Sequence, residues 1–370
     1  MLGVFAVVVG CGSGGGGTPG AGGSAGSAMG GTAGDGVGGA SGSGGAAGAS
    51  AGGSGGSAAG GTASGAGGTA GGGAGSTGSG GQRAVTSFTV PLFASDPYGI
   101  AAGPDGNLWF GETVNNQVGR VTPAGVMTEF PVPATAGRIG SITAGPDGNL
   151  WFIQFSPAAI GRITPAGTIK INAISADAGD IAAGADGNVW FSVPTTNKIC
   201  RITPTGVVTY FSIPTSDSAP TGVTKGPDGN VWFTEAQKIA RVTPDGTVTE
   251  FPVTGLAARP SDIVTGADGN LWFTESAAGA KIGRMTPAGT VTEFALPVSN
   301  QVDTITTGPD GNLWFTDTGT KSVGRITPAG VVTEFVVTDA RGTLGGITAG
   351  PDGNIWFTNR VYFQICYIRP

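Results

Sequence analysis

Histidine is absent from all 370 residues of the chain, and only 11% of the residues are charged. Without histidine the chain can form no Ser-His-Asp or Cys-His nucleophile arrangement, no histidine general base and no histidine-ligated zinc site. Lys and Arg form no run, so the clustered cations that bind nucleic-acid phosphates are missing and we expect no nucleic-acid partner. No apolar run reaches the roughly 18 residues of a membrane-spanning helix.

Seven tryptophans divide residues 83–370 into regular units. Each one follows a Gly-x-Asp-Gly-Asn sequence and one apolar residue, precedes a phenylalanine, and lies 39 to 42 residues from the next. A fixed period near 40 residues is typical of stacked repeat architectures. The seven are Trp109, Trp151, Trp190, Trp232, Trp272, Trp314 and Trp356.

One unit, residues 222–253, shows how each repeat should fold. Turn signals at 227–230 and 243–246 separate short β-prone segments at 222–226, 231–235, 238–242 and 247–251. Four antiparallel strands in about 40 residues are typical of one blade of a β-propeller. The sequence therefore predicts an all-β, seven-bladed propeller with four-stranded antiparallel blades.

The ends of the repeat array predict how the ring closes. The last unit offers three strands, near 346–350, 354–358 and 361–368, and stops before a fourth. Residues 85–91 read like the fourth strand of the other units, for example 248–253. Pairing of 85–91 with 361–368 would complete the seventh blade and leave no open sheet edge.

The repeated residues have structural interpretations. We expect each tryptophan to pack between neighbouring sheets and each Asp of the Gly-x-Asp-Gly-Asn sequences to form a turn, because these sequences lack the spacing of a calcium loop. The Arg of the third strand and the Glu of the fourth predict a cross-strand ladder of ion pairs. Cys200 and Cys366 occupy one repeat position in different units, which should lie too far apart in a ring for a disulfide.

The N-terminal part has a different composition. Residues 1–11 are apolar and end in Val8-Val9-Gly10-Cys11, which resembles a bacterial lipobox, with Cys11 as the lipidated residue; the alternative is an apolar N-terminus without that role. Residues 12–82 are rich in Gly, Ala, Ser and Thr, with Asp35 as the only charge, and predict a disordered tether. We expect an exported, lipid-anchored protein of the bacterial cell envelope, at the outer membrane or cell surface, that contacts the membrane only through this anchor.

Ligands of propellers usually meet the mouth of the central channel, where the loops entering each first strand and leaving each second strand converge. These segments differ between the repeats and are rich in carboxylates, which could bind a hard cation; the alternative is a solvated acidic rim. The entering segments include Asp96, Tyr98, Asp180, Arg259, Ser261, Asp262 and Asp303, and the leaving segments include Glu112, Glu235, Glu275 and Asp317.

The repeat resembles that of the streptogramin lyase (virginiamycin B lyase) family. Gly308-Pro309-Asp310-Gly311-Asn312-Leu313-Trp314-Phe315-Thr316, followed by 323–330 and 332–335, carries the resemblance, which covers residues 85–370. The resemblance implies a seven-bladed propeller that linearises cyclic streptogramin B depsipeptides by Mg²⁺-dependent elimination at the ester bond.

The resemblance places this chemistry in the last two blades, where the family carries two Pro-His-x-Ile elements. Here the corresponding residues are 302–305 and 344–347, so Asp303 and Gly345 stand at the histidine positions. Thr343 replaces an acidic residue, and 356–360 replaces a glutamate-bearing strand end.

Three functions remain open. The first is a monomeric, membrane-anchored binding or scaffold module without lyase activity. The second is a carbon-oxygen lyase that uses carboxylates, with Asp303 as the candidate base and Glu275 and Asp317 as candidates for Mg²⁺ binding. The third is recognition of a small molecule, peptide or glycan at the channel mouth, where the candidate residues are Tyr98, Glu112, Glu235, Arg259, Ser261, Glu275, Asp303 and Asp317.

Overall fold

The computed structural model describes residues 84–92, 94–133, 137–253, 259–276, 279–296, 301–337 and 343–370. All of them belong to one unit of the chain, residues 71–370. The predictions for residues 1–11, for lipidation at Cys11 and for the tether at 12–82 lie outside the described residues. Within the described ranges, no helix is long and apolar enough to cross a membrane.

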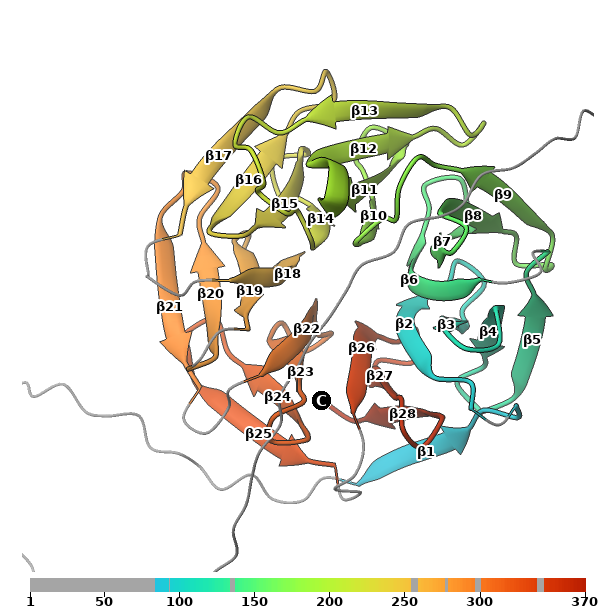
Figure 1. Cartoon of the computed structure of the whole chain (residues 1–370). Helices are drawn as coiled ribbons and strands as arrows, with labels where there is room; N and C mark the ends of the chain where they lie inside the picture. Colours follow the sequence, from blue (N-terminus) through green and yellow to red (C-terminus); the bar gives the residue numbers. More distant parts are fainter. Residues whose placement is uncertain are drawn as a thin grey trace, which may run out of the picture. The chain divides into compact units, whose positions relative to one another are not determined.

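The described strands form seven four-stranded antiparallel sheets arranged as the blades of a ring (Figure 1), which confirms the predicted fold. Blades 1 to 3 consist of β2 (Pro97–Ala102), β3 (Leu108–Glu112), β4 (Gln117–Val121) and β5 (Met127–Pro131); β6 (Arg138–Ala144), β7 (Leu150–Phe155), β8 (Ala159–Ile163) and β9 (Ile169–Ala173); and β10 (Ile181–Ala183), β11 (Val189–Val193), β12 (Lys198–Ile202) and β13 (Val208–Ser212). A short 3-10 helix, η1 (Pro194–Thr196), joins β11 to β12.

The remaining blades follow the same order from the first strand to the fourth. Blades 4 to 7 consist of β14 (Val223–Lys225), β15 (Val231–Glu235), β16 (Lys238–Val242) and β17 (Val248–Pro252); β18 (Pro260–Thr265), β19 (Leu271–Glu275), β20 (Lys281–Met285) and β21 (Val291–Ala295); β22 (Val302–Thr307), β23 (Leu313–Asp317), β24 (Ser322–Ile326) and β25 (Val332–Val336); and β26 (Leu344–Ala349), β27 (Ile355–Asn359), β28 (Gln364–Ile368) and β1 (Val85–Thr89).

The N-terminal strand closes the ring as predicted. β1 pairs antiparallel with β28 (Figure 1), and in this register Phe88 lies opposite Ile365. β28 begins three residues later than the predicted segment, because 361–363 form a turn in which Phe363 has a φ of 53°. The seventh blade is therefore built from both ends of the repeat array.

The tryptophans pack between blades, as expected. Trp109 of blade 1 lies in one core cluster with Leu150 and Phe152 of blade 2, and Trp356 of blade 7 lies in a cluster with Phe110 of blade 1. The same cluster contains Val90, which follows the closing strand. Each large aromatic ring therefore removes apolar surface of two sheets from water at once.

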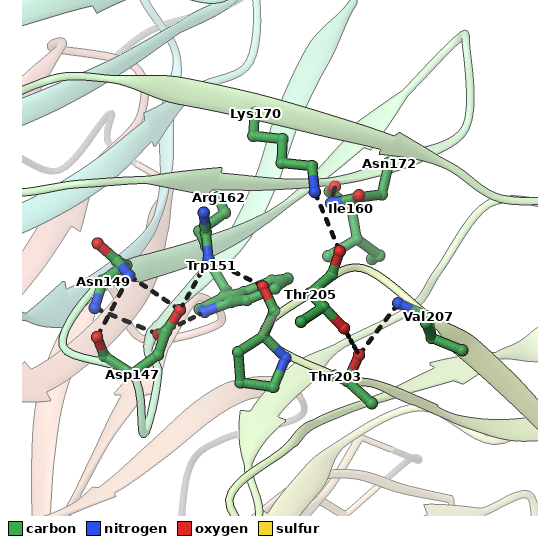
Figure 2. A network of polar contacts seen from close by, with 11 residues as sticks. Asp147, Asn149, Trp151, Ile160, Arg162, Lys170, Asn172, Thr203, Thr205 and Val207 are labelled. Carbon is green, nitrogen blue, oxygen red and sulfur yellow. Dashed lines mark hydrogen bonds and ion pairs between the residues drawn. The ribbon is translucent and has the colours of Figure 1, made fainter.

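The Asp of each Gly-x-Asp-Gly-Asn turn holds the indole of its own blade. In blade 2, Asp147 Oδ1 accepts hydrogen bonds from Trp151 Nε1 (2.9 Å) and from the backbone N–H of Asn149, and Asp147 Oδ2 accepts one from Asn149 Nδ2 (Figure 2). Burial disfavours the ionised form, but these hydrogen bonds outweigh it and lower the pKa of the Asp147 carboxyl. These Asp residues therefore fix the turn to the core.

The expected ladder between Arg of the third strand and Glu of the fourth is wrong. Arg162 contacts the turn residue Asp147 (3.3 Å; Figure 2) and donates to the carbonyl oxygen of Pro204 in the next blade (2.9 Å). In blade 1, Arg120 lies opposite Thr128 of β5, whereas Glu129 lies opposite Gly119. Because adjacent residues of a strand face opposite sides, the Arg and Glu side chains point away from each other.

Cys200 and Cys366 are both buried free thiols, in agreement with the expectation that they form no disulfide. Each lies opposite the phenylalanine that follows its blade's tryptophan. In four other blades this place is a glycine, and a Cβ at Gly119 would meet Phe110 at 2.1 Å. The position therefore favours small residues because the phenylalanine ring lies over it.

Candidate functional site

The first strands of the blades surround a cavity of about 270 Å³ on the channel axis. These strands approach so closely that several positions tolerate only glycine: a Cβ at Gly99 would lie 2.7 Å from Ser141 Cα, and one at Gly222 would lie 2.6 Å from the Ser261 carbonyl oxygen. The polar residues that line the cavity are Tyr98, Ser141, Asp180, Thr221, Ser261, Asp262, Asp303 and Thr304.

Hydroxyl groups from the second strands hold these lining residues in place. Thr274 Oγ1 donates to the Asp303 carbonyl oxygen (3.0 Å), and Thr358 Oγ1 donates to that of Tyr98 (2.8 Å). Thr234 Oγ1 bonds the Ser261 carbonyl oxygen in the same way (2.9 Å). Each bond joins one blade to the first strand of the next. The threonine that follows Trp-Phe in these blades is the sequence signal for these bonds, although the motif by itself indicates only scaffold.

Asp180 and Asp262 connect neighbouring blades across the cavity wall. Asp180 Oδ2 accepts a hydrogen bond from the backbone N–H of Val223 (2.9 Å), and Asp262 Oδ2 accepts one from that of Ile305 (2.8 Å). Burial raises the pKa of both carboxyl groups, and the charge of Asp180 raises that of Asp262 further. These two aspartates therefore line the cavity and also join neighbouring blades by hydrogen bonds.

Asp303 and Tyr98 differ from these aspartates because an arginine lies beside them. Arg360 donates two hydrogen bonds of 2.8 Å to Asp96 and lies 5.0 Å over the ring of Tyr98. Burial raises the pKa of Asp303, and the Arg360 charge opposes that rise. Burial, followed by the charges of Asp303 and Asp180, raises the pKa of Tyr98 to about 12, so its hydroxyl stays protonated.

The cavity therefore presents carboxylate and hydroxyl oxygens to a ligand. Carboxylates accept hydrogen bonds, and Ser, Thr and Tyr hydroxyls both donate and accept them. Such a lining suits a ligand group with N–H or O–H donors. Sequence reasoning did not single out Ser141 and Thr304, because their place in the lining depends on how the first strands meet around the cavity. It also missed the pairing of Arg360 with Asp96, which depends on how blades 7 and 1 meet.

The structure brings together only some of the predicted site residues. Tyr98, Ser261 and Asp303 line the cavity, and Asp180 and Asp262 lie with them. Arg259 is exposed and lies outside this lining. The four carboxylates at the ends of the second strands are not in the lining and are at most 3% exposed: Glu112, Glu235, Glu275 and Asp317.

These four carboxylates lie inside their blades, beside the glutamate of the fourth strand, and not at the channel mouth. The charge of Glu293 acts on Glu275, and the charge of Asp317 acts on Glu334. Among the described residues, no group of three or more His, Cys, Asp or Glu side chains is arranged to hold a metal ion. Glu275 and Asp317 end second strands of different blades, so the structure does not bring them together, and their role in Mg²⁺ binding stays a prediction.

Glu235 should make stability depend on pH. Burial, followed by the charge of Glu250, raises the pKa of Glu235 from 4.5 to about 7 although Lys238 opposes the rise. The folded protein then keeps a proton that the unfolded chain releases, so the stabilisation is complete below about pH 4.5 and is lost as the pH rises to about 7. Through this carboxyl group the wild type should lose about 1–3 kcal/mol of unfolding free energy between pH 5 and pH 8. Glu235→Gln should not show this loss.

Urea unfolding at the two pH values measures this effect. Asp245→Asn, a change at a carboxylate with an exposed side chain in the same blade, is the matched control and should keep the pH dependence of the wild type. Glu275, which has a similarly raised pKa, leaves part of the dependence in every variant. The interpretation is wrong if Glu235→Gln and the wild type lose the same stability between pH 5 and pH 8.

Comparisons with known proteins agree with this fold. The model of the virginiamycin B lyase family matches residues 75–180 and 171–370. A solved streptogramin B lyase is 30% identical, with a TM-score of 0.74 and coverage of 77% of this chain and 97% of that one. Virginiamycin B lyase from Staphylococcus aureus is 31% identical, with a TM-score of 0.74 and coverage of 78% and 100%. A catalytically inactive histidine-to-alanine variant of that enzyme, solved with quinupristin, has the same scores. The search of curated proteins gives no match.

Proposed function

Because this chain belongs to the virginiamycin B lyase family, we propose that it is a binding propeller of that family that does not catalyse lactone elimination. The observation that carries the proposal is the residue content of the two positions at which the resemblance places histidines. They hold Asp303 and Gly345, and the chain contains no histidine elsewhere. The inactivity of the histidine-to-alanine relative supports the importance of such a side chain.

Gly345 cannot easily be replaced by a larger residue here. A Cβ at this position would meet Thr358 Oγ1 at 2.5 Å. The Gly345 carbonyl oxygen accepts hydrogen bonds from Thr304 Oγ1 (2.9 Å) and Thr316 Oγ1 (3.1 Å). The surroundings of Gly345 are thus organised around a backbone without a side chain, and elimination needs a base that glycine cannot supply.

Asp303 is a better ligand-binding group than a base. Its carboxyl lines the cavity together with the protonated Tyr98 hydroxyl, and the Arg360 charge acts on both. The volume of about 270 Å³ is close to the lower limit of small-molecule pockets, roughly 300 Å³. The site would accept one donor-rich group of a small molecule, peptide or glycan, while the rest of the ligand lies on the mouth.

The proposal includes display at the bacterial cell envelope. The lipobox-like residues ending at Cys11 and the Gly- and Ser-rich residues 12–82 support an anchored domain on a tether, whose relaxed span is on the order of 50 Å. Cys11→Ser should move the protein from the membrane fraction to the soluble fraction. An unchanged distribution would count against the anchor without affecting the binding proposal.

A mass-spectrometric assay tests the absence of lyase activity. Residues 82–370 are incubated with a streptogramin B and Mg²⁺, with the S. aureus virginiamycin B lyase as the positive control. We expect the cyclic substrate to persist. A ring-opened product of unchanged mass would overturn the proposal and establish the alternative, a carboxylate-based lyase. If such a product forms, its loss in Asp303→Asn would assign the base.

A further inference from the structure

Four blades contain a pair of facing carboxylates inside the sheet, one at the end of the second strand and one in the fourth strand. We call each of them an acid pair. The acid pairs are Glu112–Glu129 in blade 1, Glu235–Glu250 in blade 4, Glu275–Glu293 in blade 5 and Asp317–Glu334 in blade 6. The second-strand member is at most 3% exposed in every case.

In blades 4 and 5, a lysine neutralises the acid pair. Lys238, the first residue of β16, lies opposite Glu235 in β15 and Pro252 in β17, and its Nζ lies 2.8 Å from Glu250 Oε2. Lys281 occupies the same place in blade 5 and forms an ion pair with Glu293. A positive charge thus has a defined location beside the fourth-strand carboxylate of these blades.

Blade 1 has the same backbone register but no such charge. Gln117, the first residue of β4, lies opposite Glu112 in β3 and Pro131 in β5. Its side chain is one bond shorter than that of lysine and is neutral whichever way its amide is turned. The lysine ammonium of blades 4 and 5 therefore has no counterpart in blade 1.

Three buried oxygens of these residues have no partner among the described residues, although the other Glu112 oxygen, Oε2, accepts a hydrogen bond of 3.4 Å from Asn115 Nδ2. Glu112 Oε1, Gln117 Oε1 and Glu129 Oε1 accept no hydrogen bond from the described residues, and neither glutamate takes part in an ion pair with them. Glu112 is fully buried. Thr215, which bonds Glu250 through its N–H and hydroxyl, corresponds to Leu92 before blade 1, so the hydroxyl donor is missing as well.

We propose that blade 1 binds a hard cation with oxygen ligands between Glu112 and Glu129, where a lysine ammonium lies in blades 4 and 5. A fully buried carboxylate beside a half-buried one, with no counter-charge, is costly, and a cation coordinated by carboxylate and amide oxygens removes that cost. Calcium takes such ligands at about 2.3–2.6 Å and adapts to irregular geometry. This site is separate from the channel cavity and from the residues that the family resemblance assigns to Mg²⁺.

Blade 6 lacks the lysine too but compensates in part within the protein. Ser322 takes the place of Gln117, and its hydroxyl opposes the rise in the pKa of Glu334 that burial and the Asp317 charge cause. Asp317 Oδ1 accepts a hydrogen bond from the backbone N–H of Thr320 (2.9 Å). Asp317 Oδ2 and Glu334 Oε1 still lack partners among the described residues. Of the two acid pairs without a lysine, only blade 1 adds an unpartnered amide oxygen, that of Gln117, and blade 6 offers a matched control position.

The experiment measures the thermal unfolding midpoint of the full chain at pH 8 in calcium chloride and in choline chloride of equal ionic strength. We expect calcium to raise the midpoint by about 5 °C at a hundredfold excess over its dissociation constant. Gln117→Lys should abolish the calcium response, because its ammonium fills the site, and should unfold in choline at a higher temperature than the wild type. Ser322→Lys should keep the response.

The outcomes separate the alternatives. An equal midpoint for the wild type in calcium and in choline overturns the proposal and leaves protonation as the way in which the pair is neutralised. A calcium response that persists in Gln117→Lys, or that disappears only in Ser322→Lys, overturns the assignment to blade 1. If Gln117→Lys does not fold, calorimetric titration of Glu129→Gln with calcium replaces it, and undiminished binding there overturns the proposal.

Discussion

Ser87→Cys should lock the ring with a disulfide to Cys366 and raise the free energy of unfolding by about 3–5 kcal/mol. Ser87 in β1 lies directly opposite Cys366 in β28. The Val90 N–H donates to the Phe363 carbonyl oxygen (2.8 Å), so in this register 87 and 366 form one of the closer, non-hydrogen-bonded pairs. Their side chains leave the same face of the sheet at a spacing that suits a disulfide.

The size of this effect follows from the length of chain that the bond encloses. A link between 87 and 366 restricts almost the entire propeller in the unfolded state, and the entropic stabilisation grows with the enclosed length. Chemical denaturation with and without reductant measures it. The double variant Ser87→Cys/Cys366→Ser is the control and should show no dependence on reductant. Failure of the thiols to pair in the oxidised single variant would contradict the closure of the ring by β1.

Trp232→Ala should lower the free energy of unfolding by about 3–5 kcal/mol. The indole is fully buried, stacks on Phe251 at 5.2 Å between ring centroids, and shares a core cluster with Leu271 and Phe273 of blade 5. Its loss leaves a cavity between two blades. It also removes the N–H that donates to Asp228 Oδ1 at 2.9 Å.

The variant Trp232→Phe separates these two contributions. It keeps an aromatic ring between the blades but not the bond to Asp228, and we expect it to cost about 1–2 kcal/mol less than the alanine variant. Tyr210→Ala, at an exposed aromatic side chain of blade 3, should change stability by no more than about 0.5 kcal/mol. Equal urea midpoints for Trp232→Ala and Tyr210→Ala would contradict the role of the tryptophan as an interblade wedge.

The architecture was predictable because its signals are local and repeat seven times. Gly and Asn in each turn, alternation in each strand and one tryptophan per unit all favour the same structure. The closing strand was also predictable, since 85–91 resembles the strand that the last unit lacks. The family resemblance rests on the same repeated residues, and the comparisons confirm it.

The errors concern which face of a strand a side chain occupies. Arg120 and Glu129 lie in neighbouring strands, but in the observed register their side chains face opposite sides of the sheet. Glu112 and Glu275 end second strands and were expected at the channel mouth, yet they lie within their own blades beside Glu129 and Glu293. A shift of one residue decides such questions, and composition does not contain that information.

The sequence by itself determined the number of blades, the strands in each and the partner of the N-terminal strand, because short-range turn and strand preferences suffice for these. Only the tertiary structure decided which polar groups share the cavity: Tyr98 of blade 1 and Asp303 of blade 6 are about 200 residues apart in the sequence and line the same cavity. It also showed that Gln117 stands where other blades hold a lysine ammonium. The physical reason is that burial and charge pairing depend on distances across blades, which repeat patterns do not encode.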